Sequence, residues 1–256
     1  MKRVLLVGCM LLPILGAGWC ALFASDETPD EQGSESGVVL TFIGHESFLL
    51  TTQSGSRVLM DPYNDRPGGL RAMPTDLAPD AVTISHEHDD HNNAGCAPGA
   101  QILKTAGSYQ VGDITVTGYA GREGSPYGPS AMVNVIFVFE VAGVKIVHLG
   151  DSGPVTDPAT LDAIANADVV IVNIDGYVIP QGKILPFLTE IFARTTIIGH
   201  YTVKLSSPFG GAPTVDQFFA RLPESVVRVK SEESTLLVVP GMATQILAMT
   251  PTTLIK

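Results

Sequence analysis

Short apolar runs separated by turn residues make up most of the chain after Val38, and they predict more strands than helices. Runs that are rich in Val, Ile, Phe and Thr and bounded by Gly, Ser, Pro or Asp are typical of β-strands. The predicted strands are Val38–Ile43, Ser47–Thr52, Arg57–Asp61, Ala81–Ser85, Ile114–Tyr119, Val133–Val141, Lys145–Leu149, Val169–Ile174, Thr196–Ile198 and Thr235–Val239.

Helical spacing of apolar residues appears only in the second half of the chain. Asp157-Pro158 is a typical helix start, and apolar residues then recur on one face as far as Ala167. Leu185–Phe192 and Val215–Leu222 are the other predicted helices. Because helices come between strands only late in the chain, the pattern predicts one mixed α/β (α+β) domain over residues 38–256. We expect its sheets to pack together and to be flanked by helices.

A different pattern precedes this domain. Lys2 and Arg3 are followed by an apolar run from Val4 to Ala24, which is typical of an export signal or of an uncleaved membrane anchor. Residues 25–37 are acidic and rich in Ser and Gly, so they predict a linker that buries little. We therefore expect residues 1–24 to direct export to the periplasm, the cell envelope or the medium.

Composition excludes several classes of protein. The chain has 15 basic and 26 acidic residues among 256, a net charge of −11, which argues against nucleic acid or an anionic membrane as its partner. Any membrane contact is expected only through an uncleaved N-terminal segment. Cys9 and Cys20 lie in the predicted signal, so Cys96 is left alone and a disulfide framework is excluded.

Three histidines and an aspartate crowd into six positions, as His86-x-His88-x-Asp90-His91. In an extended segment the side chains of His86, His88 and Asp90 point the same way, and a turn brings His91 round to join them. Imidazole and carboxylate ligands at this density predict a divalent metal, zinc first and iron or manganese next. A solvated polar loop is the weaker alternative, because half of the chain's six histidines are here.

Two further candidate ligands, Asp151 and His200, follow the ends of later predicted strands. Loops at strand ends are where binding residues gather in α/β domains. We therefore expect both side chains to help complete the metal shell.

These residues together resemble the metallo-β-lactamase fold superfamily. The His86 to His91 motif, Gly150-Asp151 and His200-Tyr201 carry the resemblance. Three further pieces are similar to the branch of ascorbate-6-phosphate lactonase-like and N-acyl-phosphatidylethanolamine phospholipase D-like hydrolases: Ile43–Leu49, Val58–Pro62 and Asn134-x-Ile136-Phe137. The resemblance implies an αββα sandwich with a metal site at one edge of the two sheets, and a hydrolase whose small-molecule substrate stays unspecified.

The resemblance also implies a role for each residue of the motif. His86 and His88 match ligands of a first metal, Asp151 matches a bridging carboxylate, and the ligands of a second metal match Asp90, His91 and His200. His45 and Asp61 match positions that orient ligands. His148 matches a position that is often histidine without being a ligand, and a structural role is expected for it.

One departure from the family pattern concerns the first metal. The family has another histidine between the strands that begin at Ile114 and Val133, but Gly118–Gly128 contains none. Glu123 is one candidate replacement. A single-metal enzyme, or a first site filled only when substrate is present, is the other expectation, so we expect one or two metals per chain.

The chemistry that the resemblance implies is hydrolysis. A divalent ion lowers the pKa of its bound water to about 7, and the resulting hydroxide would attack an ester, lactone or phosphodiester. Asp90 and Tyr201 are the candidate catalytic residues, with Tyr201 either donating a hydrogen bond to the oxyanion or only packing. The alternatives are a metal-binding envelope protein with weak or no turnover and a non-catalytic interaction domain.

Overall fold

A computed structural model describes residues 37–64, 68–123, 133–203 and 212–255. These residues belong to one unit, Glu35–Lys256. The predicted signal and nearly all of the predicted linker lie outside the described residues. Within the described ranges, none of the helices is long and apolar enough to cross a membrane.

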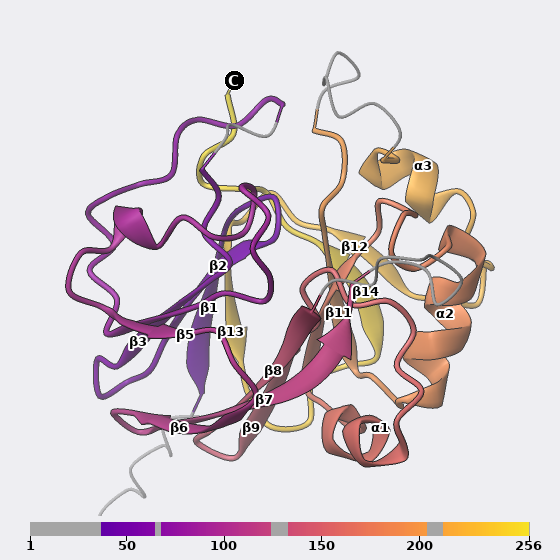
Figure 1. Cartoon of the computed structure of the whole chain (residues 1–256). Helices are drawn as coiled ribbons and strands as arrows, with labels where there is room; N and C mark the ends of the chain where they lie inside the picture. Colours follow the sequence, from indigo (N-terminus) through magenta and orange to yellow (C-terminus); the bar gives the residue numbers. More distant parts are fainter. Residues whose placement is uncertain (1–36, 65–67, 124–132, 204–211, 256) are drawn as a thin grey trace, which may run out of the picture. The chain divides into compact units, whose positions relative to one another are not determined.

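Two mixed β-sheets face each other in this unit (Figure 1). The first has six strands in the order β13-β1-β2-β3-β4-β5. β13, β1, β2 and β3 pair antiparallel, whereas β3, β4 and β5 are parallel. The bounds are β1 (Val38–Gly44), β2 (Ser47–Thr51), β3 (Arg57–Met60), β4 (Ala81–Thr83), β5 (Gln101–Leu103) and β13 (Thr235–Val238).

The second sheet has eight strands in the order β12-β14-β11-β10-β9-β8-β7-β6. Its strands from β6 to β9 pair antiparallel, and those from β9 through β10, β11 and β14 to β12 are parallel. The bounds are β6 (Gly107–Val111), β7 (Ile114–Arg122), β8 (Val133–Val141), β9 (Val144–His148), β10 (Val169–Asn173), β11 (Thr195–Gly199), β12 (Arg228–Lys230) and β14 (Gln245–Ala248).

The main core lies between the two sheets. Every second side chain of a strand points to the same face, so the inward positions of both sheets form one apolar cluster. Phe42 and Leu50 contribute from the first sheet, and Phe137, Ile146 and Ile171 from the second. These side chains are at most 1% exposed, so their packing holds the two sheets against each other.

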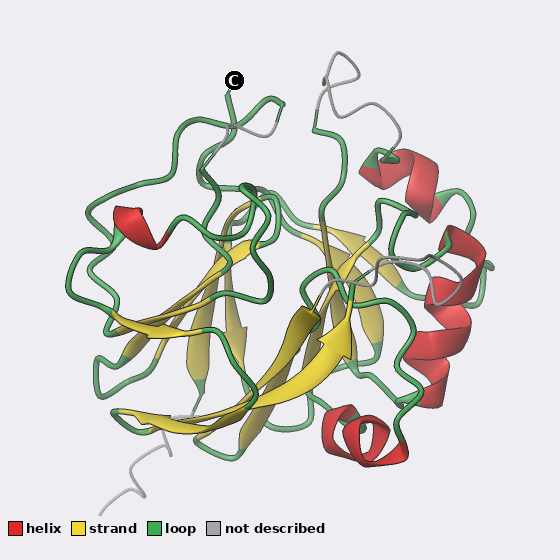
Figure 2. Ribbon diagram, viewed as in Figure 1, coloured by secondary structure: helices red, strands yellow, loops and turns green. Residues whose placement is uncertain are grey.

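The outer faces of the sandwich are covered differently (Figure 2). A second cluster packs the eight-stranded sheet against the helices α1 (Pro158–Ile164), α2 (Gln181–Glu190) and α3 (Val215–Phe219). The other face of the six-stranded sheet is covered by a third cluster, drawn from loops and the short 3-10 helix η1 (Ala94–Cys96). The predicted sandwich of packed sheets is confirmed, and the described α-helices all lie on one side of it.

The structure extends the predicted list of elements. The strands β5, β6, β12 and β14 were not predicted, because they are short or partly exposed and lack a clear apolar alternation. α2 begins at Gln181, earlier than the predicted Leu185, since Gly182 and the internal Pro186 weaken its helical pattern. α1 begins as predicted, with Asp157 accepting a hydrogen bond from the Thr160 amide at its N-cap.

The topology brings the carboxyl ends of parallel strands from both sheets to one region. Two main-chain hydrogen bonds link the sheets there: Val135 N donates to Ser85 O at 2.8 Å, and His200 N donates to His45 O at 2.9 Å. Segments that follow β3, β4, β9, β10 and β11 therefore lie near one another. This is the edge at which polar side chains from distant parts of the sequence meet.

Truncation of a core leucine tests the sheet packing. Leu50 on β2 is 0% exposed, so Leu50→Ala leaves a cavity and should lower the free energy of unfolding by about 2–5 kcal/mol. Leu237 on β13 is 51% exposed, and Leu237→Ala is the matched control, with an expected loss below about 1 kcal/mol. Chemical denaturation of both variants measures the difference. Equal losses would contradict the assignment of Leu50 to the inter-sheet core.

Candidate metal centre

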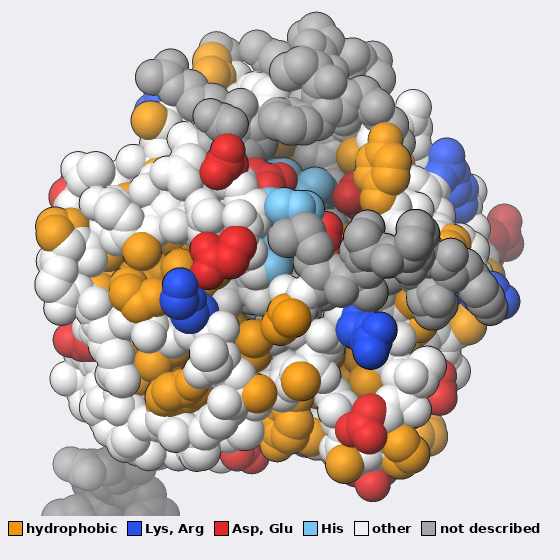
Figure 3. All heavy atoms as spheres, viewed as in Figure 1, with side chains coloured by type: hydrophobic (Ala, Val, Ile, Leu, Met, Phe, Trp, Pro, Cys, Tyr) orange, Lys and Arg blue, Asp and Glu red, His pale blue; other side chains and the backbone are white. Residues whose placement is uncertain are grey.

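Five of the chain's six histidines gather with acidic side chains at the edge where the sheets meet. Histidine side chains are visible among acidic ones on the face shown in Figure 3. They come from the β1–β2 turn, from the segment after β4 and from the end of β11. Their ligand atoms form two groups in which all the atoms of a group lie within 4.8 Å of one another.

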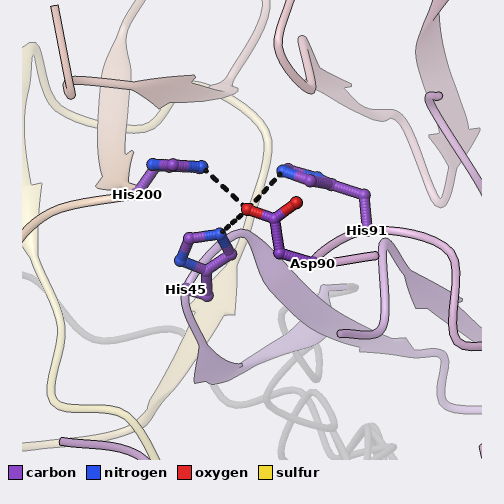
Figure 4. Close-up of side chains that lie close together, drawn as sticks. All are labelled: His45, Asp90, His91 and His200. Carbon is purple, nitrogen blue, oxygen red and sulfur yellow. Dashed lines mark hydrogen bonds and ion pairs between the residues drawn. The ribbon is translucent and has the colours of Figure 1, made fainter. Parts of the chain in front are cut away.

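The first group consists of His45, Asp90, His91 and His200, whose side chains point toward one another (Figure 4). Oδ2 of Asp90 lies at its centre, 2.9 Å from Nε2 of His45, 3.4 Å from Nε2 of His200 and 3.8 Å from Nε2 of His91. One carboxylate oxygen thus faces three imidazole nitrogens. The structure brings together the three residues predicted as second-metal ligands and adds His45 to them.

The second group consists of His86, His88, Glu123 and Asp151. Nε2 of His86 lies 3.7 Å from Oδ2 of Asp151, and Nδ1 of His88 lies 3.3 Å from Oε1 of Glu123. The two predicted first-metal histidines and the predicted bridging aspartate are therefore close together. Glu123, the candidate replacement for the missing histidine, lies with them.

Asp151 stands between the two groups. Its Oδ1 lies 3.7 Å from Nε2 of His91, and its Oδ2 lies 3.7 Å from Nε2 of His86 and 4.0 Å from Nε2 of His200. One carboxylate therefore presents an oxygen to histidines of both groups. This is the placement that a carboxylate bridging two cations requires.

Several buried ligand atoms lack a hydrogen-bond partner among the described residues. They are Nε2 of His86, Nε2 of His91 and Oε2 of Glu123. A buried polar atom without a partner costs free energy, so most such atoms in folded proteins are hydrogen-bonded. Imidazole nitrogens and carboxylate oxygens are ligands of zinc, iron and manganese. The donor set and the unpaired atoms fit divalent cations.

Carboxylates lie behind two of the histidine rings, and the one behind His91 is within hydrogen-bond distance. Nδ1 of His91 lies 2.9 Å from Oδ2 of the fully buried Asp61, and Nδ1 of His200 lies 3.6 Å from Oδ2 of Asp175. The Asp61 carboxylate also accepts hydrogen bonds from the amide and the hydroxyl of Ser85. Such contacts to one ring nitrogen leave the other free to bind a metal. Asp61 has the orienting position that the resemblance implies.

Amide side chains hold Asp151. Asn173 Nδ2 donates to Asp151 Oδ1 at 2.6 Å, and the Asp151 amide donates to Asn134 Oδ1 at 3.1 Å. Gly150, which has a φ of +54°, forms the turn before Asp151, and a Cβ atom there would lie 2.4 Å from Ser85. Sequence analysis assigned no role to Asn173 or Asp175. The sequence does mark both residues, because they are polar and lie at the end of an otherwise apolar predicted strand.

The carboxylates at the centre are held ionised. Burial by itself raises the pKa of Asp90, but the rings of His200 and His45 outweigh it and hold that pKa well below its usual range. Burial likewise opposes the ionisation of Asp151, and the nearby His91 and His200 lower its pKa below the usual range. The site therefore concentrates negative charge in a place with little water.

Four of the histidines form two pairs according to whether their pKa is raised or lowered. Burial lowers a histidine pKa, yet Asp151, Asp61 and Asp90 raise the pKa of His91 to about 10, and Asp151 and Asp90 raise that of His200 to about 9. In contrast, burial and His200 lower the pKa of His45 to about 3. Burial and His91 lower the pKa of His86 to about 4. Positive charge is favoured on His91 and His200, where the attraction of several carboxylates together outweighs burial.

Two residues from the sequence analysis lie outside these groups. Nε2 of the buried His148 lies 3.1 Å from the Glu46 carbonyl oxygen, which is the backbone contact expected of a structural histidine. The Tyr201 hydroxyl donates to the Met249 carbonyl oxygen at 2.9 Å, and its ring packs against the apolar clusters. The structure thus gives Tyr201 a packing contact and does not bring its hydroxyl into the metal centre.

Comparison with known proteins places this geometry in a family. Residues 39–197 match the family described as "Beta-lactamase superfamily domain". A relative from Methanosarcina barkeri, named a UPF0173 metal-dependent hydrolase, is 24% identical over 65% of this chain and 84% of its own length. A second, from Thermococcus onnurineus and with the same name, is 27% identical over 65% of this chain and 75% of its own length.

Solved structures share the fold. A crystal structure from Thermotoga maritima, described as "a putative zn-dependent hydrolase of the metallo-beta-lactamase superfamily", has a TM-score of 0.63 and 26% identity. The match covers 83% of this chain and 98% of that one. Because the family match spans more than half of the residues and the two-sheet sandwich is the same, the chain belongs to the beta-lactamase superfamily and has the metallo-beta-lactamase fold.

Proposed function

We propose that this metal-dependent hydrolase of the metallo-beta-lactamase fold holds divalent cations at two adjacent positions and cleaves an ester, a lactone or a phosphodiester. The observation that carries the proposal is the placement of Asp151 between two histidine groups, each of which has one buried Nε2 atom, that of His91 or His86, without a hydrogen-bond partner among the described residues. Most buried polar atoms in folded proteins have a hydrogen-bond partner, and here the atoms without one face a shared carboxylate.

Each of the two proposed cation positions has its own set of ligands. We assign Asp90, His91 and His200 to one cation and His86 and His88 to the other, with Asp151 shared. His45, whose Nε2 lies 2.9 Å from Asp90, holds that carboxylate in place.

Zinc is the proposed cation. Three or four ligands of this kind suit it, and the description of the related Thermotoga maritima structure names zinc.

The proposed chemistry depends on the chain's own groups and on the bound cation. Asp61 orients the His91 ring, Asn173 holds Asp151, and Asp175 lies 3.6 Å from the His200 ring. A bound divalent ion supplies Lewis acidity and lowers the pKa of water. Asp90, with its pKa held low, stays ionised through the reaction and is the proposed reacting-centre carboxylate.

The geometry disfavours a non-catalytic interaction domain. Ionised Asp90 and Asp151 lie beside largely buried histidines, and burying such charge is costly without a compensating partner. An interaction surface has no need for this arrangement. A metal-binding protein without turnover keeps the same ligands, so turnover itself must be measured.

Hydrolysis assays on the full chain test the function. We expect zinc-loaded protein to cleave at least one of nitrophenyl esters, simple lactones and bis-nitrophenyl phosphate, and chelator to abolish that activity, because the reaction depends on the cation. His91→Ala should lose most of the activity and bind fewer zinc ions per chain by elemental analysis. His148→Ala is the matched control, which should lower thermal stability and keep its metal. Absence of turnover on all three classes would overturn the hydrolytic function and favour a metal-binding protein.

Metal affinity should rise with pH. The pKa values of His91 and His200 are about 10 and about 9, so both rings are positively charged imidazolium groups at neutral pH. Each ring must lose one proton before its nitrogen can bind a cation. From about pH 6 to about pH 8 the affinity should increase up to tenfold per pH unit for each proton displaced. Competition with a chelator of known pH dependence measures this, together with proton release by calorimetry in two buffers. A flat profile would contradict the direct ligation of these two rings.

We also propose that the protein is exported. The support is the sequence pattern of Lys2 and Arg3 followed by the apolar run to Ala24, all outside the described residues. After expression in a bacterial host, the protein should be recovered from the envelope or periplasmic fraction. Mass spectrometry then distinguishes cleavage near Ala24 from an uncleaved anchor. Recovery of soluble cytosolic protein with an intact Met1 would contradict the export proposal.

A further inference from the structure

Glu123 follows the end of strand β7 and lies at the metal centre. The strand ends at Arg122, and Glu123 continues it through an antiparallel bridge to Ser152, directly after Asp151. The Gly153 amide donates to the Arg122 carbonyl oxygen at 2.7 Å and fixes this approach. The chain at Glu123 is therefore held against the loop that carries the shared carboxylate.

Gly121 lies next to the same loop but offers no side chain to the metal centre. Residues 121 and 123 face the same side of an extended strand. A Cβ atom on Gly121 would lie 3.2 Å from Ser152 Oγ and 3.2 Å from the Asn134 carbonyl oxygen, so this position also borders the Asp151 loop. It carries no side chain, and the next residue on the same face is Glu123.

The Glu123 carboxylate points into the second group of ligands. Its Oε1 lies 3.3 Å from Nδ1 of His88, and its side chain is 15% exposed. Its Oε2 is buried and has no hydrogen-bond partner among the described residues. The ligand atoms of Glu123, His86, His88 and Asp151 all lie within 4.8 Å of one another.

A simple ion pair with His88 leaves part of this arrangement unexplained. It accounts for Oε1, but Oε2 of Glu123 and Nε2 of His86 stay buried without a partner. His86 is only 3% exposed, so water does not readily satisfy its nitrogen. One cation bound among the four side chains satisfies these atoms together.

We propose that Glu123 is the fourth protein ligand of the first metal position, with His86, His88 and Asp151. The inference rests on the proposed function and deepens it. The resulting set has two imidazoles and two carboxylates, where one more imidazole was expected from the family pattern. Carboxylate oxygen favours harder cations such as manganese, so this position should discriminate less in favour of zinc than a site with three imidazoles.

Metal content tests the ligand directly and without an activity assay. Full-length wild type, loaded with zinc and passed through gel filtration, should retain two ions per chain by elemental analysis. Glu123→Ala should retain about one, with an affinity for the second ion at least about tenfold weaker. Glu123→Gln, which keeps the shape and removes the charge, should also bind the second ion more weakly.

Glu140→Gln is the matched control. It removes the same charge from β8 at an exposed position that pairs with Thr115, far along the strands from the Arg122–Val133 end. This variant should keep both ions, and circular dichroism should show that all variants fold. Equal zinc content in wild type and Glu123→Ala would overturn the inference. The proposed function would then still be judged by His91→Ala, which acts on the other position.

Metal preference gives a second readout. In dialysis against equal zinc and manganese, Glu123→His should hold two ions and shift the zinc-to-manganese ratio at one position toward zinc, because imidazole replaces a carboxylate. An unchanged ratio with both ions retained would contradict direct ligation by residue 123.

Discussion

Negative charge gathered in a place with little water is the constraint on which the rest of the centre depends. Asp61, Asp90 and Asp151 are held ionised next to the histidines that surround them, and burial alone would favour their neutral forms. The raised pKa values of His91 and His200 show the same field acting on the rings. Such a cluster is stable only with compensating positive charge, which protons or divalent cations supply.

The fold makes this concentration possible by letting parallel strands end together. Side chains that follow β3 and β4 in one sheet face side chains that follow β9, β10 and β11 in the other. The inter-sheet core holds the two sheets in this arrangement. Two main-chain hydrogen bonds, from Val135 to Ser85 and from His200 to His45, connect the sheets at the edge that carries the ligands. Stability and function are thus coupled, because a shift of one sheet on the other would separate the ligands.

The unusual feature of this member of the superfamily is the strand that faces the first metal position. A glycine at residue 121 and a glutamate at residue 123 stand in a segment where a histidine was expected. The Glu123 carboxylate lies close to His88 and belongs to the group formed with His86 and Asp151. In the proposed site a carboxylate stands in place of a neutral ring, and burial raises the pKa of Glu123, so a cation bound there would favour its ionised form.

Local pattern was enough to predict the two-sheet class, most strands and the His86 to His91 motif. Apolar alternation and metal-ligand spacing are properties of short segments, so they can be read without a structure. The short strands β5, β6, β12 and β14 were not predicted, because neighbouring strands in the sheet stabilise them more than their own sequence does. The shared position of Asp151 was expected from the family resemblance, whereas the approach of Glu123 to His88 and the contact of the Tyr201 hydroxyl with Met249 depend on long-range packing. Sequence determined which ligands were available, and only the tertiary structure decided which of them meet, because residues far apart in the chain become neighbours through the burial of the common core.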